Sequence, residues 1–146
     1  MSIDIIRAAE IAYKKHWQST SDESTGDKQA SAATKKWQDT VKSTGIIDTE
    51  VSIGCRLNQR IDVIDYSTET AYEMKVSSKN PDHEFYKDIF KVIIYNQNHP
   101  TKVKRFVFII GEKGARQLNR GLAEAVKHYI TNHELNIEVK GIKETI

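Results

Sequence analysis

The residues best suited to chemistry in this chain are two carboxylates and a lysine: Asp62, Glu73 and Lys75. They stand in two neighbouring segments, 60–66 and 70–77, which are rich in strand-forming residues and are separated by the polar turn 67–69. Side chains two positions apart on a strand share a face, so Glu73 and Lys75 are expected to point the same way. If the two strands pair as a hairpin, Asp62 lies near both. The sequence therefore predicts three ionisable groups that converge on one sheet face.

Such a set suits the hydrolysis of a phosphodiester. Two carboxylates can hold a hard divalent cation such as Mg²⁺, with Mn²⁺ as a substitute, and leave positions open for water and a phosphate oxygen. The cation polarises the phosphoryl group and lowers the pKa of the attacking water. A nearby ammonium group stabilises the negative charge of the transition state. The alternative is an ordinary Glu-x-Lys on a solvent-facing strand, with Asp62 an unrelated acid near a turn.

The elements that must position these groups follow from hydrophobic periodicity and from turn residues. We expect helices at 3–17, 28–43, 81–98 and 114–132, and strands at 47–57, 60–66, 70–77, 105–110 and 137–139. The first three strands should be antiparallel, and the continuous apolar run 105–110 should be buried on both faces. This order predicts an α/β fold with a mixed central β-sheet flanked by helices.

The helix expected at 81–98 begins with strong signals, because Asn80 can cap it and Pro81 suits its first turn. Phe85, Ile89 and neighbouring apolar residues form one stripe along it. Phe90 and Ile94 widen that stripe, so we expect two sides of this helix to be covered.

Composition narrows the class of protein. At 146 residues, with 38% hydrophobic and 29% charged residues, the chain has the size and balance of a single globular domain, residues 1–146. Its one cysteine, Cys55, leaves neither an internal disulfide nor a CxxC zinc motif, which favours a reducing compartment. No apolar run is long enough to cross a bilayer, and the N-terminus lacks the pattern of a signal peptide. A cytoplasmic protein without a membrane partner is the expectation.

The order of elements around Asp62 and the Glu73-x-Lys75 motif resembles the core of the PD-(D/E)XK nucleases, the restriction-endonuclease-like superfamily. The resemblance covers roughly residues 3–112, and Ile61 stands where the motif has proline. It implies that Asp62 and Glu73 bind the metal and that Lys75 assists catalysis. It also implies a Mg²⁺-dependent nuclease, a hydrolase acting on nucleic acid, with DNA as the expected substrate and endonucleolytic cleavage as the expected mode.

Other residues are candidates for the same site. Many members of the superfamily add a glutamate from the first helix, and Glu10 fits because it falls on the apolar side of its helix; it could equally be a flanking acid. Glu50 on the first strand competes with it. Asp65 should face the opposite way and serve a turn or salt bridge. Ser77 continues the face of Glu73 and could touch a phosphate or cap the strand end.

Partners are predicted less closely. Basic residues between Lys75 and Arg120 form either a phosphate-contacting face or a solvated surface, because the net charge is only +2. One cleavage site in a chain of this size favours a homodimer, or a subunit of a larger nuclease system, if both strands are cut. A function of another class also remains open: a catalytically inactive nucleic-acid-binding or assembly module with the same fold.

Overall fold

The computed structural model describes residues 4–16, 26–42, 46–76, 80–121, 124, 126, 128 and 135–143. The elements follow in the predicted order: α1 (Ile5–His16), α2 (Gly26–Lys42), β1 (Ile47–Ser52), β2 (Arg60–Asp65), β3 (Thr70–Lys75), α3 (Pro81–Asn98), β4 (Arg105–Gly111), α4 (Glu112–Asn119) and β5 (Asn136–Ile142). Strand β1 is shorter than expected because Gly54, Cys55 and Arg56 have φ of 93°, 55° and 60°, which turns the chain out of the strand. Strand β5 is longer than expected. Among the described residues, no helix is both long and apolar enough to cross a membrane.

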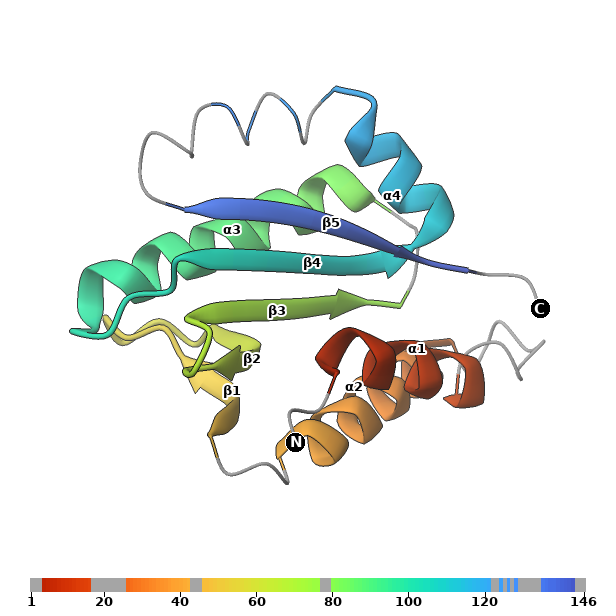
Figure 1. Cartoon of the computed structure of the whole chain (residues 1–146), viewed down its shortest axis with the longest axis horizontal. Helices are drawn as coiled ribbons and strands as arrows, with labels where there is room; N and C mark the ends of the chain where they lie inside the picture. Colours follow the sequence, from red (N-terminus) through yellow and green to blue (C-terminus); the bar gives the residue numbers. More distant parts are fainter. Residues whose placement is uncertain are drawn as a thin grey trace.

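The five strands form one mixed sheet in the order β1-β2-β3-β4-β5 (Figure 1). Strands β1, β2 and β3 are antiparallel, as predicted, because short loops join them. Strand β4 lies parallel to β3, and β5 lies parallel to β4, because α3 and the α4 segment carry the chain back across the sheet. The protein is therefore of the mixed α/β class.

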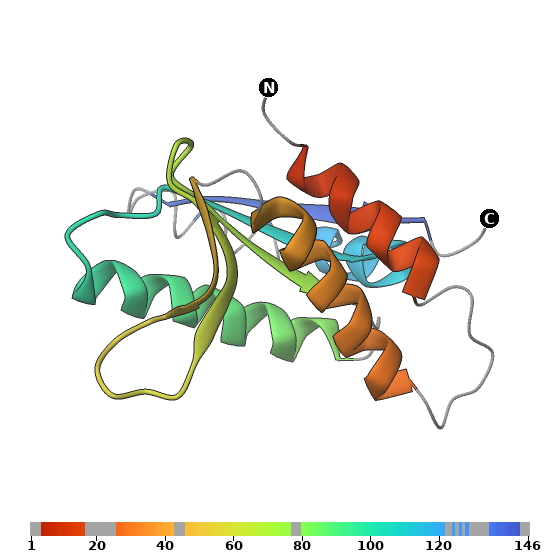
Figure 2. The ribbon, with the colours of Figure 1, turned by 90° about the horizontal axis from the view of Figure 1, so that it is seen from below.

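Each face of the sheet has its own hydrophobic core. One core joins α1 and α2 to Tyr72 and Met74 of β3 and to Val107 and Ile109 of β4. The other joins α3 and α4 to the alternate residues of the same strands, such as Ala71. Figure 2 shows α1 and α2 lying together, apart from α3. The central residues of β4 are fully buried, which confirms that this strand is covered on both faces.

Helix α3 begins and ends where the sequence predicts. Its cap residue Asn80 has a left-handed backbone, φ 49°, and makes no side-chain cap hydrogen bond. Phe85 and Ile89 are buried against the sheet, but Phe90 is 64% exposed. The prediction that Phe90 is covered is therefore wrong. Only one side of α3 packs on the sheet, and the helix turns its outer side to solvent.

Candidate active site

Asp62 and Glu73 lie beside each other where the regular pairing of β2 and β3 ends. The ladder pairs Val63 with Tyr72, and continuing that register places Asp62 opposite Glu73. The backbone N–H of Asp62 donates to Oε1 of Glu73 at 3.2 Å, and the backbone N–H of Met74 donates to Oδ2 of Asp62 at 3.1 Å. Each carboxylate thus accepts an N–H from the neighbouring strand. The expected proximity of the two acids is confirmed.

A lysine that the sequence placed only among the phosphate-contacting or solvated basic residues completes this group. The Nζ of Lys91, on α3, lies 2.6 Å from Oε1 of Glu73 and 3.1 Å from Oδ1 of Asp88. It also donates a hydrogen bond to the carbonyl oxygen of Arg60 at 2.7 Å. We call Asp62, Glu73, Asp88 and Lys91 the acid cluster. The sequence did hold a signal: Asp88 lies one turn from Phe85 on the apolar stripe of α3, an unusual place for a lone carboxylate.

The acid cluster holds more acidic than basic groups. Burial raises the pKa of Glu73 well above its usual value, and the charges of Asp62 and Asp88 raise it further, against the opposing effect of Lys91. Burial also raises the pKa of Asp88 to about 6, although Lys91 works to lower it. Burial works to lower the pKa of Lys91, but the charges of Glu73 and Asp88 outweigh it and raise that pKa. Three carboxylates against one ammonium group leave two uncompensated negative charges when all are ionised.

Lys75 lies at the outer rim of this face. It follows Glu73 by two residues on β3, and its side chain remains 34% exposed. Its Nζ is 3.6 Å from Oε1 of Glu84, and Lys87 lies 2.9 Å from the other oxygen of that carboxylate. Burial works to raise the pKa of Glu84, but the hydrogen bond from Lys87 and the charge of Lys75 lower it overall. Lys75 therefore shares the face of Glu73 but pairs with the first turn of α3.

The structure does not bring Glu10 or Glu50 to the acid cluster. Helix α1 packs on the opposite face of the sheet, and Glu10 pairs there with Arg7 at 3.1 Å. Glu50 is exposed on β1 with φ 51°, and its carbonyl group accepts a hydrogen bond from Arg60. The expectation that a glutamate of the first helix joins the site is thus corrected by the side of the sheet on which α1 lies.

Two further candidates have different outcomes. Asp65 accepts hydrogen bonds from the backbone N–H and the hydroxyl group of Ser67, at 3.0 and 2.6 Å, which confirms its expected role in the turn. Ser77 lies outside the described residues.

The fit of the acid cluster to a metal ion depends on how many protein ligands the ion needs. Within the described ranges, no three His, Cys, Asp or Glu side chains form a group that could hold an ion. Mg²⁺, however, usually keeps several waters and takes only one or two carboxylates from the protein. Asp62 and Glu73 fit that smaller requirement, because they are adjacent and lie near a third carboxyl group, that of Asp88.

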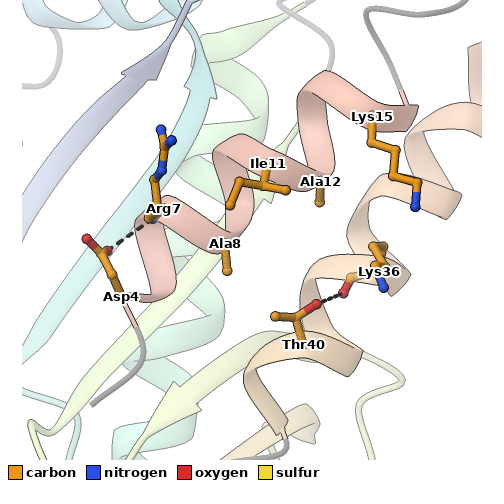
Figure 3. A pocket seen from close by; sticks show the side chains of 8 residues that line it. All are labelled: Asp4, Arg7, Ala8, Ile11, Ala12, Lys15, Lys36 and Thr40. Atoms are coloured by element: carbon orange, nitrogen blue, oxygen red, sulfur yellow. Dashed lines mark hydrogen bonds between the residues drawn. The ribbon is translucent and has the colours of Figure 1, made fainter. Parts of the chain in front are cut away.

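A separate hollow of about 360 Å³ lies between α1 and α2 (Figure 3). Ala8 and Ile11 line its apolar part, and Arg7 and Lys36 are among the polar residues at its edge. Since both helices pack on the face opposite Glu73, this hollow is not part of the acid cluster.

Comparisons with protein-family models, with curated proteins and with solved structures give no match. The chemistry of the acid cluster and the arrangement of the sheet are therefore the basis for a function.

Proposed function

We propose that this chain is a Mg²⁺-dependent nuclease with a restriction-endonuclease-like core, in which Asp62 and Glu73 hold the metal and Lys75 assists catalysis. DNA is the proposed substrate, and endonucleolytic cleavage the proposed mode. Mn²⁺ should replace Mg²⁺, since it prefers similar oxygen ligands.

The observation that carries the proposal is the pairing of the Asp62 and Glu73 carboxylates across β2 and β3. Each is fixed by an N–H group of the opposite strand, so the two acids hold their mutual position without a ligand. With Asp88 close by, the group holds three carboxyl groups against the one ammonium group of Lys91, and a divalent cation bound there would favour their ionised forms. When bound, Mg²⁺ would polarise the scissile phosphate and activate water.

Lys75 supports the second part of the proposal. Its ammonium group lies on the face of Glu73 and reaches solvent, so it can meet a phosphate that approaches from outside. A cation held at that position stabilises negative charge as it develops on the phosphoryl oxygens. Its ion pair with Glu84 is partly exposed and weak enough to exchange for a phosphate.

The direct test is the cleavage of supercoiled plasmid with Mg²⁺, with RNA and single-stranded DNA tested alongside. Wild type should cleave at least one of these substrates. Asp62→Asn, Glu73→Gln and Lys75→Ala should each lose about 100-fold or more in rate, since each removes a metal ligand or a transition-state contact. Equal rates in all four proteins would refute the proposed function.

Glu69→Gln and Lys104→Ala are matched controls. These residues form an ion pair of 3.5 Å next to the opposite end of β3. The two substitutions therefore remove one negative and one positive charge at a distance from the acid cluster. Both variants should cleave at the wild-type rate. A similar loss in the controls would mean that overall charge, and not the acid cluster, governs the reaction.

A second function, nucleic-acid binding or assembly without catalysis, is favoured by one observation. Lys91 already pairs with Glu73, and the glutamate is only 4% exposed. A non-catalytic protein with this fold should bind DNA in a salt-sensitive way, without cleaving it and without binding metal. Calorimetric titration with Mn²⁺ separates the two functions.

A further inference from the structure

Lys91 stands out among the lysines described by the structure because its ammonium group is buried. Its side chain is 10% exposed, whereas that of Lys87, one turn earlier on the same helix, is 55% exposed. Burying an ammonium group is costly unless several acceptors surround it. Lys91 has three: the carboxylates of Glu73 and Asp88 and the carbonyl oxygen of Arg60.

These contacts hold the ammonium group of Lys91 against one carboxylate oxygen of Glu73. Oε1 of Glu73 accepts both from Lys91 and from the backbone N–H of Asp62. The Arg60 carbonyl group precedes Asp62 by two residues on β2. The ammonium group is therefore held next to the carboxylate that the proposed function assigns to the metal.

From this geometry we infer that Lys91 is a positioning residue that competes with a divalent cation for Glu73 and so sets the metal affinity of the site. This inference rests on the proposed function. A fixed positive charge within a few ångströms repels a divalent cation, and the repulsion is strong where the surroundings exclude water. The same ammonium group keeps Glu73 oriented and offsets part of the negative charge of the acid cluster.

The inference predicts an unusual result, in which the loss of a site residue improves ligand binding. We expect Lys91→Gln to bind Mn²⁺ at least about tenfold more tightly than wild type in calorimetric titration. Lys91→Arg keeps the charge and should gain nothing. Lys87→Gln removes an equal charge from the same helix, but its charge is screened by solvent, so its affinity should stay within about twofold of wild type.

The outcomes separate this inference from the proposed function. Tighter binding by Lys91→Gln alone, compared with a wild type that itself binds Mn²⁺, supports the inference. If wild type binds Mn²⁺ and Lys91→Gln binds equally or more weakly, the inference fails while the proposed function stands. An equal gain in Lys87→Gln also overturns it. If neither wild type nor Lys91→Gln binds Mn²⁺, the metal site itself is refuted, and both ideas fall.

Lys91→Gln leaves Glu73 and Asp88 without their counterion and is expected to fold less well. If it is too unstable to titrate, its refolding from urea is followed at increasing Mn²⁺, because a ligand that binds only the folded state raises the folded fraction. The refolded fraction should rise more steeply with Mn²⁺ for Lys91→Gln than for wild type. A refolded fraction that does not respond to Mn²⁺ contradicts the inference.

Discussion

The two faces of β3 differ in kind although they belong to one strand. Tyr72 and Met74 pack among apolar side chains of α1 and α2, whereas Glu73 pairs with Lys91 of α3 and lies near Asp88 of the same helix. The apolar face is stabilised by burial of hydrocarbon, which needs no special geometry. The charged face depends on exact partners, because a buried carboxylate without them destabilises the fold. One face of β3 is therefore held by apolar packing alone, and the other places the acid cluster beside a second apolar core.

The largest effect is expected from breaking the apolar face. Trp37 on α2 is fully buried there, and its indole N–H donates to the carbonyl group of Ile5 at 3.1 Å. Trp37→Ala should lower the free energy of unfolding by about 3–5 kcal/mol, measured by urea denaturation. Mn²⁺ affinity of the remaining folded protein should be unchanged. A loss of affinity in this variant would show that the two faces are not independent.

A smaller effect is expected from the charged face as pH changes. The pKa of Asp88 is about 6 in the folded protein, above its usual 3.8. Because the folded state binds this proton more tightly than the unfolded state does, protonation of Asp88 stabilises the fold. This contribution is fully present below pH 4 and is lost as pH rises through 6. We expect the free energy of unfolding to fall over this window by on the order of 1–3 kcal/mol.

The control for this pH dependence is Asp88→Asn, which removes the carboxylate but keeps its shape. Its unfolding free energy should change less between pH 4 and pH 7 than that of wild type. An identical pH profile in the variant would assign the effect to other groups.

Removing the most strongly perturbed acid should separate stability from function. The pKa of Glu73 is raised well above its usual value, chiefly by burial, so its ionised form is unfavourable in the folded state. Glu73→Gln should thus raise the free energy of unfolding near pH 7, because the amide needs no buried charge, while metal binding is lost. Chemical denaturation and Mn²⁺ titration of the same sample measure both. A lower free energy of unfolding in this variant would mean that the ion pair between Glu73 and Lys91 stabilises the fold by more than burying the Glu73 charge destabilises it.

The smallest effect is expected on the outer side of α3. Phe90 is 64% exposed, and truncating it removes little buried surface. Phe90→Ser should change the free energy of unfolding by less than about 0.5 kcal/mol. A larger loss would show that this side of α3 is covered in solution.

Local sequence patterns predicted the strands and their acids well. The alternation of residues along β2 and β3 fixes which side chains share a face, and the short turn at 67–69 fixes their register. For this reason the proximity of Asp62 and Glu73 could be predicted. The order of the elements and the buried β4 strand were predictable for the same reason, since each depends on neighbouring residues alone.

The remaining features depend on contacts between distant elements. The pairing of Lys91 with Glu73 was missed because it is a contact between α3 and β3, which the residue pattern of neither element gives by itself. Glu10 was placed at the site because an apolar stripe shows that a helix packs on a sheet but not on which face. Phe90 was expected to be covered because it belongs to the apolar stripe of α3, but only part of that stripe packs on the sheet.

The charged groups of the acid cluster come from one continuous stretch of chain. Asp62 and Glu73 are 11 residues apart, and the most distant contact of Lys91, with the Arg60 carbonyl group, spans 31. Bringing them together closes loops of 11 to 31 residues, and the entropic cost of closing a loop grows only slowly with its length. The ionic network thus draws on β2, β3 and α3 and includes no residue of β5, which pairs with the far edge of β4.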